Sequence, residues 1–279
     1  MNSKINGFSE KAIENVIASA RGNVSVYFKD ISSGWTFEHE ASSKIPSASL
    51  IKVPILLHLL MEAASGRIDM QEIVTIKPCN RVAGTGVLDG FPENVALPWE
   101  TLARLMIILS DNCATNEILD KVGISGVQGF IDSMGLKETS IERKMMDFTA
   151  IKEGKNNYTS VRDMGTLFAA LADGKWGEDF SQKTFRILKR QQMRHLLPLL
   201  IPAVPSDKNA ESIFLPPSGM VLVGNKTGDL TDKLHDVGWF ILPDGRSYVL
   251  AIMTYNLPML SDGLPTISEI SRLIYKSMC

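Results

Sequence analysis

Apolar residues near the amino terminus follow first the repeat of a helix and then the repeat of a strand. After Ser9, a residue type that caps helices, apolar side chains recur at positions 12, 13, 16 and 17, which predicts an amphipathic helix that ends by Gly22. Residues 24–28 alternate between apolar and outward-facing positions, as a half-buried strand does. After a turn at 32–34, residues 35–38 are expected to form the return strand.

The pattern changes to helices between Ser49 and about Ala170. The ranges expected to be helical are 49–64, 98–109, 115–122, 127–134 and 161–172. Pro98 is expected in the first turn of the second of these helices, where its missing N–H costs nothing.

The last third of the chain returns to strands. Adjacent strands are expected at 221–225, 237–242 and 248–254, the last two joined by a turn at 243–246, and a closing helix at 266–276. Strands at both ends of a helical middle predict an α/β (α+β) fold. In this fold residues 1–45 and 180–279 form one lobe, and residues 46–179 form an all-helical lobe.

Composition and charge exclude some classes of function. The 279 residues carry a formal net charge of −2, so a basic face for nucleic acid is not expected. The apolar runs at 53–61 and 196–204 are too short to span a bilayer. Residues 1–10 show no leader peptide, so we expect a cytoplasmic protein, or a secreted or periplasmic one if a leader was removed. We expect a monomer with a small-molecule substrate.

Neither a metal nor a cofactor is expected. The three cysteines, Cys79, Cys113 and Cys279, lie far apart and form no zinc or disulfide pattern, which fits a reducing compartment. The four histidines show no ligand spacing, and His58, on an apolar helix, is expected to be a structural residue of the core.

Ser49 and Lys52 are the first candidates for chemistry. They lie three residues apart at the start of an apolar helix, so the amine can reach the hydroxyl. A hydroxyl becomes an effective nucleophile when a neighbouring base takes its proton, and a desolvated lysine near other cations can be that base. The pair alone is also compatible with a helix cap beside a solvated lysine.

Ser110-Asp111-Asn112, at the end of the predicted helix 98–109, is the second motif. A second serine can relay a proton to a leaving nitrogen, and an asparagine amide can orient both a lysine and a substrate carbonyl. Alone, the tripeptide would also fit a helix end followed by the cap of the next helix.

Lys226-Thr227-Gly228, at the end of the predicted strand 221–225, is the third motif. Lysine and threonine there can hold a substrate carboxylate. Glycine allows the backbone to approach closely, so the next N–H, that of Asp229, can point at an oxyanion. Alone, the tripeptide would also fit a plain turn at a strand end.

In this order, the three motifs resemble the Ser-x-x-Lys, Ser-Asp-Asn and Lys-Thr-Gly set of class A β-lactamases and penicillin-binding proteins. The resemblance covers nearly the whole chain. Residues 84–88 resemble the loop that precedes Ser-Asp-Asn, and His235-Asp236 stands where the family often has an Asn-Asp pair. The resemblance implies a β-lactamase/transpeptidase-like fold, an antiparallel sheet flanked by helices plus a helical lobe, with the active site between the lobes.

The resemblance also implies a role for each residue. Ser49 attacks the carbonyl, and Lys52 helps to remove the proton of Ser49. Ser110 and Lys226 handle the leaving nitrogen and the negative charge of the substrate, while Asn112 positions the acyl side chain. The backbone N–H groups of Ser49 and Asp229 form the oxyanion hole. The remaining substrate-binding positions are Thr227, Gly228 and His235, and His235 has a structural hydrogen-bonding role as its alternative.

The sequence departs from the family where deacylation is concerned. The family carries Arg-x-Glu-x-x-Leu-Asn on a loop, with the glutamate activating water. The matching stretch begins at Arg143 and has Met145 in place of the glutamate and Thr149 in place of the asparagine. Asp147 is the candidate carboxylate for deacylation, unless it only anchors the loop. Acylation machinery is therefore expected to be complete, and deacylation slow or altered.

Three functions remain open. The first is a class A-type hydrolase that opens β-lactams or related amides through a Ser49 acyl-enzyme. The second is a penicillin-binding peptidase or esterase that uses the same acylation step on another substrate. The third is a non-catalytic binding scaffold, since a fold alone does not fix a function.

Overall fold

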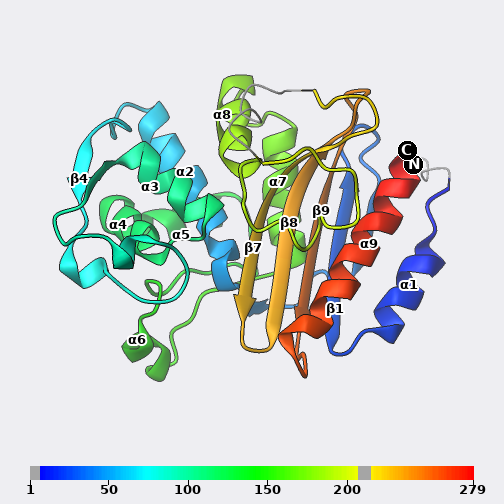
Figure 1. Cartoon of the computed structure of the whole chain (residues 1–279), viewed down its shortest axis with the longest axis horizontal. Coiled ribbons are helices and arrows are strands. Elements are labelled where there is room, and N and C mark those ends of the chain that lie inside the picture. The colour runs from blue at the N-terminus through cyan, green and yellow to red at the C-terminus, as the bar shows by residue number, and fades with distance from the viewer. Residues whose placement is uncertain (1–6, 207–214) are drawn as a thin grey trace.

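A five-stranded antiparallel sheet forms the centre of the protein, with strand order β2-β1-β9-β8-β7. The computed structural model describes residues 7–206 and 215–279; residues 1–6, part of the segment where no leader was expected, lie outside this description. Helices cover both faces of the sheet, and a second group of helices lies beyond β7 (Figure 1). The strands are β1 (Asn23–Asp30), β2 (Thr36–His39), β7 (Leu222–Leu230), β8 (Lys233–Ile241) and β9 (Ser247–Tyr255).

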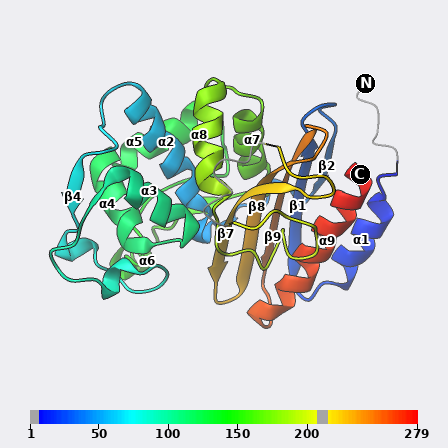
Figure 2. The same cartoon turned by 45° about the horizontal axis from the view of Figure 1, so that its top comes forward.

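The two ends of the chain build one face of the sheet together. Helix α1 (Glu10–Ser19) lies beside helix α9 (Gly263–Met278), and both cover the same side of the strands (Figure 2). Their apolar residues share one core with the sheet, which includes Ile13, Phe28 and Ile270. This arrangement explains why strand patterns occur at both termini of the sequence.

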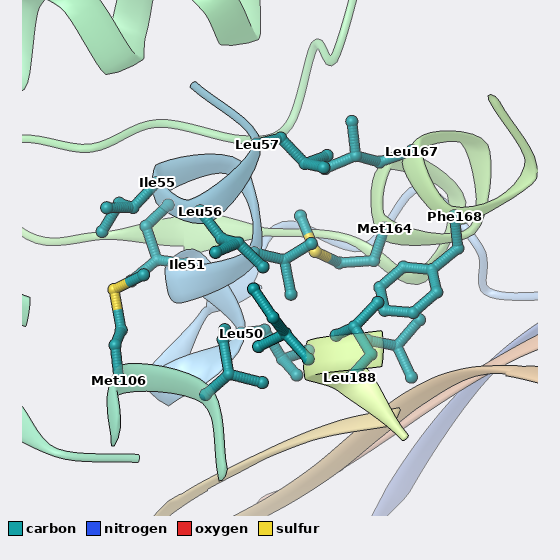
Figure 3. Packing of buried hydrophobic residues seen from close by; sticks show 14 of the residues in the cluster. Leu50, Ile51, Ile55, Leu56, Leu57, Met106, Met164, Leu167, Phe168 and Leu188 are labelled. Carbon is teal, nitrogen blue, oxygen red and sulfur yellow. The ribbon is translucent and has the colours of Figure 1, made fainter. Parts of the chain in front are cut away.

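The opposite face of the sheet shares a larger core with the other helices. Helix α2 is central to it: Leu50, which precedes the helix, and Leu56 lie among apolar side chains from neighbouring helices, including Met106, Met164 and Leu188 (Figure 3). The helices are α2 (Lys52–Ala64), α3 (Trp99–Ile108), α4 (Asn112–Val122), α5 (Ile124–Ser133), α6 (Phe148–Lys152), α7 (Val161–Ala172) and α8 (Glu178–Leu188).

Short strand pairs tie the helical part together. Strand β3 (Ile45–Pro46) pairs with β6 (Tyr158–Thr159), and β4 (Ile73–Thr75) pairs with β5 (Ala96–Pro98). No helix among residues 7–206 and 215–279 has both the length and the apolar character needed to cross a bilayer.

The expected fold class is confirmed, and several elements match closely. Ser9 caps α1, since its Oγ accepts a hydrogen bond from the Ala12 N–H at 3.3 Å. Helix α7 has the predicted ends. Helix α8 was not predicted, because the residues that it buries include Ser181 and Thr184, which interrupt the apolar stripe in the sequence.

Helices α4, α5 and α9 begin three residues earlier than predicted, and the starts of α2 and α3 also differ from the prediction. A 3-10 turn over Ala48–Ile51 precedes α2, so Ser49 lies in this turn and not in the α-helix. Pro98 caps α3 from the end of β5 instead of occupying the first turn of that helix. Its fixed extended backbone suits both the strand that ends there and the cap that follows.

Helix α7 lies within the range expected for the helical lobe, yet it packs on strands β9, β1 and β8 of the sheet. The helical group is therefore continuous with the layer that covers this face of the sheet. A lobe boundary near residue 179 stays a prediction.

Candidate active site

Ser49 lies in a turn that strand β7 approaches very closely. Ala48, just before it, has a φ of 46°, in the left-handed region that non-glycine residues rarely adopt. A Cβ added to Gly228 would lie 3.0 Å from the backbone nitrogen of Ser49 and 3.2 Å from that of Leu50. A side chain at position 228 would therefore crowd the backbone of the Ser49 turn, and glycine allows this close approach.

Lys52, one turn after Ser49, directs its amine into a cage of oxygen atoms. The Lys52 Nζ lies 3.1 Å from the Ser49 Oγ, 2.9 Å from the Asn112 Oδ1, and 2.5 and 3.0 Å from the carbonyl oxygen and Oγ of Ser110. Two of these four atoms, the carbonyl and the amide oxygen, can only accept hydrogen bonds. A neutral amine can donate to both and still offer its lone pair to a hydroxyl.

Burial favours this neutral form of Lys52. The side chain is fully buried, and desolvation, together with the nearby charge of Lys226, holds the pKa of its amine well below the ordinary value. Asp111 acts in the opposite direction, raising the pKa. The geometry therefore places a hydroxyl beside an amine of lowered basicity, and the roles of Ser49 as nucleophile and Lys52 as base stay predictions.

Ser110 connects the two lysines. Its Oγ lies 3.0 Å from the Lys52 Nζ and 3.1 Å from the Lys226 Nζ. Its φ of 56° is again left-handed, and it lies within the turn between α3 and α4. The structure thus brings Ser49, Lys52, Ser110 and Lys226 together from three separate stretches of the sequence.

The loop at residues 84–88 fixes the Ser110-Asp111-Asn112 turn. The Thr85 Oγ1 donates to the carbonyl of Ser110 at 2.8 Å, and the Asn112 N–H donates to the carbonyl of Thr85 at 3.0 Å. Asp111 accepts hydrogen bonds from the backbone N–H groups of Val87 and Leu88 at 2.7 and 3.0 Å. The role of Thr85 was not predicted.

A buried acid–amide pair lies on the sheet beside Lys226. The Asn225 Nδ2 donates to Asp236 at 2.9 Å, and the backbone N–H of Leu197 donates to the same carboxylate at 3.1 Å. Burial raises the pKa of Asp236 to about 7 and lowers that of Lys226 to about 7, while Asp236 and Asp229 oppose the lowering. The pair was missed from the sequence, although neighbouring strands would place the two residues together.

His235 faces the backbone that leads to Ser49. His235 lies on β8, directly opposite Gly228 of β7, and is fully buried. Its Nε2 lies 3.2 Å from the carbonyl oxygen of Pro46. Burial lowers its pKa to about 4, so the ring is neutral at physiological pH. This contact favours the structural alternative for His235, and a direct role at the substrate stays a prediction.

The loop that was expected to carry a deacylating carboxylate presents methionines. The Asn116 side chain holds Met145 by both backbone groups, at 2.8 Å to its N–H and 3.2 Å to its carbonyl. Met146 has a φ of 59°, in the left-handed region. Its side chain and the Asn112 amide both pack against Gly84: a Cβ added to Gly84 would lie 3.4 Å from the Met146 Sδ and 2.7 Å from the Asn112 Nδ2. The sequence could have indicated Asn116 as a residue of the site, because it lies four residues after Asn112 on the same helix face; no such signal points to Met146.

Asp147 is half-exposed and caps helix α6. Its Oδ1 accepts a hydrogen bond from the Ala150 N–H at 3.0 Å. This is the anchoring role given above as the alternative. A role of Asp147 in deacylation stays a prediction.

Within the part of the chain that the structure describes, no group of three His, Cys, Asp or Glu side chains is arranged to hold a metal ion.

Comparison with known proteins agrees with this geometry. The model of the β-lactamase enzyme family matches residues 9–278, and the chain belongs to that family as a serine hydrolase of the class A type. The extended-spectrum β-lactamase PER-1 of Pseudomonas aeruginosa is 23% identical over 75% of this chain and 67% of its own length. The β-lactamase CARB-3 of the same organism is 28% identical over 69% and 67%.

Solved structures show the same fold. A β-lactamase from Sphaerobacter thermophilus superposes with a TM-score of 0.85 at 26% identity, covering 96% of this chain and 97% of the other. PBP-A superposes with a TM-score of 0.82 at 26% identity, covering 96% and 94%. A PBP-A variant solved as an acyl-enzyme with penicillin G gives 0.83 at 26% identity, covering 96% and 95%.

Proposed function

We propose that this protein forms an acyl-enzyme at Ser49 with β-lactams or related small-molecule amides and releases the acyl group slowly. The observation that carries the proposal is the 3.1 Å separation of the Lys52 Nζ and the Ser49 Oγ, with the amine buried and its pKa lowered. The methionines at 145 and 146 support slow release, because a thioether cannot activate water.

In the acylation step, Lys52 takes the hydroxyl proton of Ser49 as the oxygen attacks the carbonyl carbon. The N–H groups of Ser49 and Asp229 stabilise the oxyanion, and each such donor contributes about 3 kcal/mol to transition-state stabilisation. Ser110 passes a proton to the leaving nitrogen and recovers one from Lys52 or Lys226, both within 3.1 Å of its Oγ. The C–N bond breaks, and the acyl group stays on Ser49.

In the second step, water must replace Ser49 at the acyl carbon. The side chain of Asp147 accepts a hydrogen bond from Ala150, and Met146 lies beside the Asn112 amide. General-base activation contributes about 10²- to 10⁴-fold to such a step, so its loss gives a long-lived adduct.

A peptidase or esterase activity is the second candidate. It is favoured by the structural similarity to PBP-A, of which a variant has been solved as an acyl-enzyme with penicillin G. In that case the same acylation machinery acts on a peptide or ester, and β-lactams act as inhibitors. The alternative of a non-catalytic scaffold is opposed by the convergence of Ser49, Ser110 and Asn112 on the buried amine of Lys52.

The test is to mix the protein with a chromogenic β-lactam and to follow both product release and intact mass. The proposal predicts a burst of about one equivalent followed by slow turnover, with the adduct on Ser49. Rapid steady turnover without a burst contradicts slow deacylation, and the absence of any adduct or turnover contradicts the proposed chemistry as a whole.

A further inference from the structure

Asp229 places a negative charge where the site is expected to receive a substrate carboxylate. It follows Gly228 near the end of β7, at the open edge of the sheet, and its side chain is exposed. Thr227 and Asp229 are two residues apart on the strand, so their side chains share one face at a spacing of about 7 Å. Thr227, with Lys226, is the position expected to hold a carboxylate.

The charge of Asp229 acts on both lysines of the site. It raises the pKa of the Lys52 and Lys226 amines, in each case against the larger effect of burial. Gly228, the residue before it, packs directly against the backbone of Ser49, so Asp229 follows the strand position nearest to the candidate nucleophile. Asp232, three residues further on, is instead paired with Lys233 at 2.6 Å.

The positive charge available to attract an anion is weak. Burial lowers the pKa of Lys226 to about 7, so this amine is only partly protonated at neutral pH. His235 is neutral and turned to Pro46.

From this juxtaposition we infer that Asp229 is a specificity-determining residue that selects against acyl donors with a carboxylate beside the scissile bond. The favoured substrates are amides or esters with a neutral or cationic group at that position. The inference rests on the proposed function, and it names the class of substrate. A like charge at this spacing near a surface weakens the reaction by about tenfold.

The test compares a chromogenic cephalosporin with its neutral methyl ester in the wild type and in Asp229→Asn. We expect the substitution to raise the acylation rate constant of the acid about tenfold and to change that of the ester less than about twofold. Asp244→Asn removes the same charge at the far turn between β8 and β9, and it should leave the ratio of acid to ester unchanged. Equal ratios in the wild type and Asp229→Asn overturn the inference.

Binding of the same two compounds to variants that also carry Ser49→Ala separates the inference from the proposed function. The Kd of the acid should fall about tenfold on Asp229→Asn, while that of the ester stays within about twofold. If Asp229→Asn leaves the ratio of the acid Kd to the ester Kd unchanged, the inference is overturned, whether or not the protein with Ser49 forms an adduct. If this ratio shifts but the protein with Ser49 forms no adduct, only the proposed function is contradicted. A lack of measurable binding by both compounds overturns both.

Discussion

The Lys226 Nζ lies 3.1 Å from the Ser110 Oγ. This contact joins the end of strand β7 to the turn between α3 and α4, and the same hydroxyl is 3.0 Å from the amine of Lys52. Two buried amines around one hydroxyl cannot both carry a full charge at low cost, because burial and mutual repulsion disfavour the charged forms. At least one of the two amines is therefore expected to be neutral, so that a proton can pass between the amines through the Ser110 hydroxyl.

A pH profile of acylation should show this arrangement. The rate rises as Lys52 loses its proton, and since its pKa is well below the ordinary lysine value, this rise occurs well below the usual range for lysine. For an anionic substrate the rate should fall as the pH rises through about 7, where Lys226 loses its charge. Lys226→Arg, which stays protonated, should move the fall to higher pH. If the fall in rate occurs at the same pH in this variant, Lys226 is not the group whose loss of charge slows the reaction.

Replacement of the base gives a second prediction. Lys52→Ala should lower the acylation rate constant by about 10²- to 10⁴-fold, because the Ser49 hydroxyl loses its proton acceptor. The variant should also lose about 1–3 kcal/mol of unfolding free energy, since the buried Asn112 amide oxygen loses its donor and the Ser110 carbonyl keeps only the hydrogen bond from Thr85. Stopped-flow acylation and urea unfolding measure the two effects. An acylation rate constant equal to that of the wild type would exclude Lys52 as the base.

The proposed slow deacylation can be tested at Met145. Met145→Glu places a carboxylate at the position where the family carries its water-activating residue, and it should shorten the life of the acyl-enzyme at least about tenfold. Met145→Gln, of similar size without a base, is the matched control. The decay of the adduct, followed by intact mass, distinguishes them. Equal lifetimes in both variants would show that the missing carboxylate does not limit release.

Close packing around the Ser110 turn gives a stability prediction. Gly86 has a φ of 119°, and an added Cβ would lie 2.3 Å from an Asp111 carboxylate oxygen. Gly86→Ala should therefore lower the free energy of unfolding by about 1–3 kcal/mol and slow acylation. Gly90→Ala, four residues on in the same loop, meets nothing within 4 Å and serves as the control. Equal unfolding midpoints for the two variants would contradict the packing.

Local sequence patterns predicted those parts of the fold whose burial repeats regularly. Helix α7 and the cap at Ser9 follow directly from spacing and residue type. Helix α8 did not, because Ser181 and Thr184 occupy buried positions that the pattern requires to be apolar. Strand ends were less certain because pairing partners, not propensity, determine where β7 to β9 stop.

Candidate site residues came from short motifs, and the residues that position them did not. Asn225 and Asp236 are eleven positions apart, and their hydrogen bond depends on the register of β7 with β8. The contact of His235 with Pro46 joins residues 189 positions apart. Such contacts depend on the three-dimensional arrangement, which local spacing does not encode.

The most direct test of the account is intact mass of the wild type and of Ser49→Ala after exposure to penicillin G. The account predicts a stoichiometric adduct on the wild type that maps to Ser49 and none on the variant. An equal adduct on both proteins, or an adduct on another residue, would contradict Ser49 as the nucleophile.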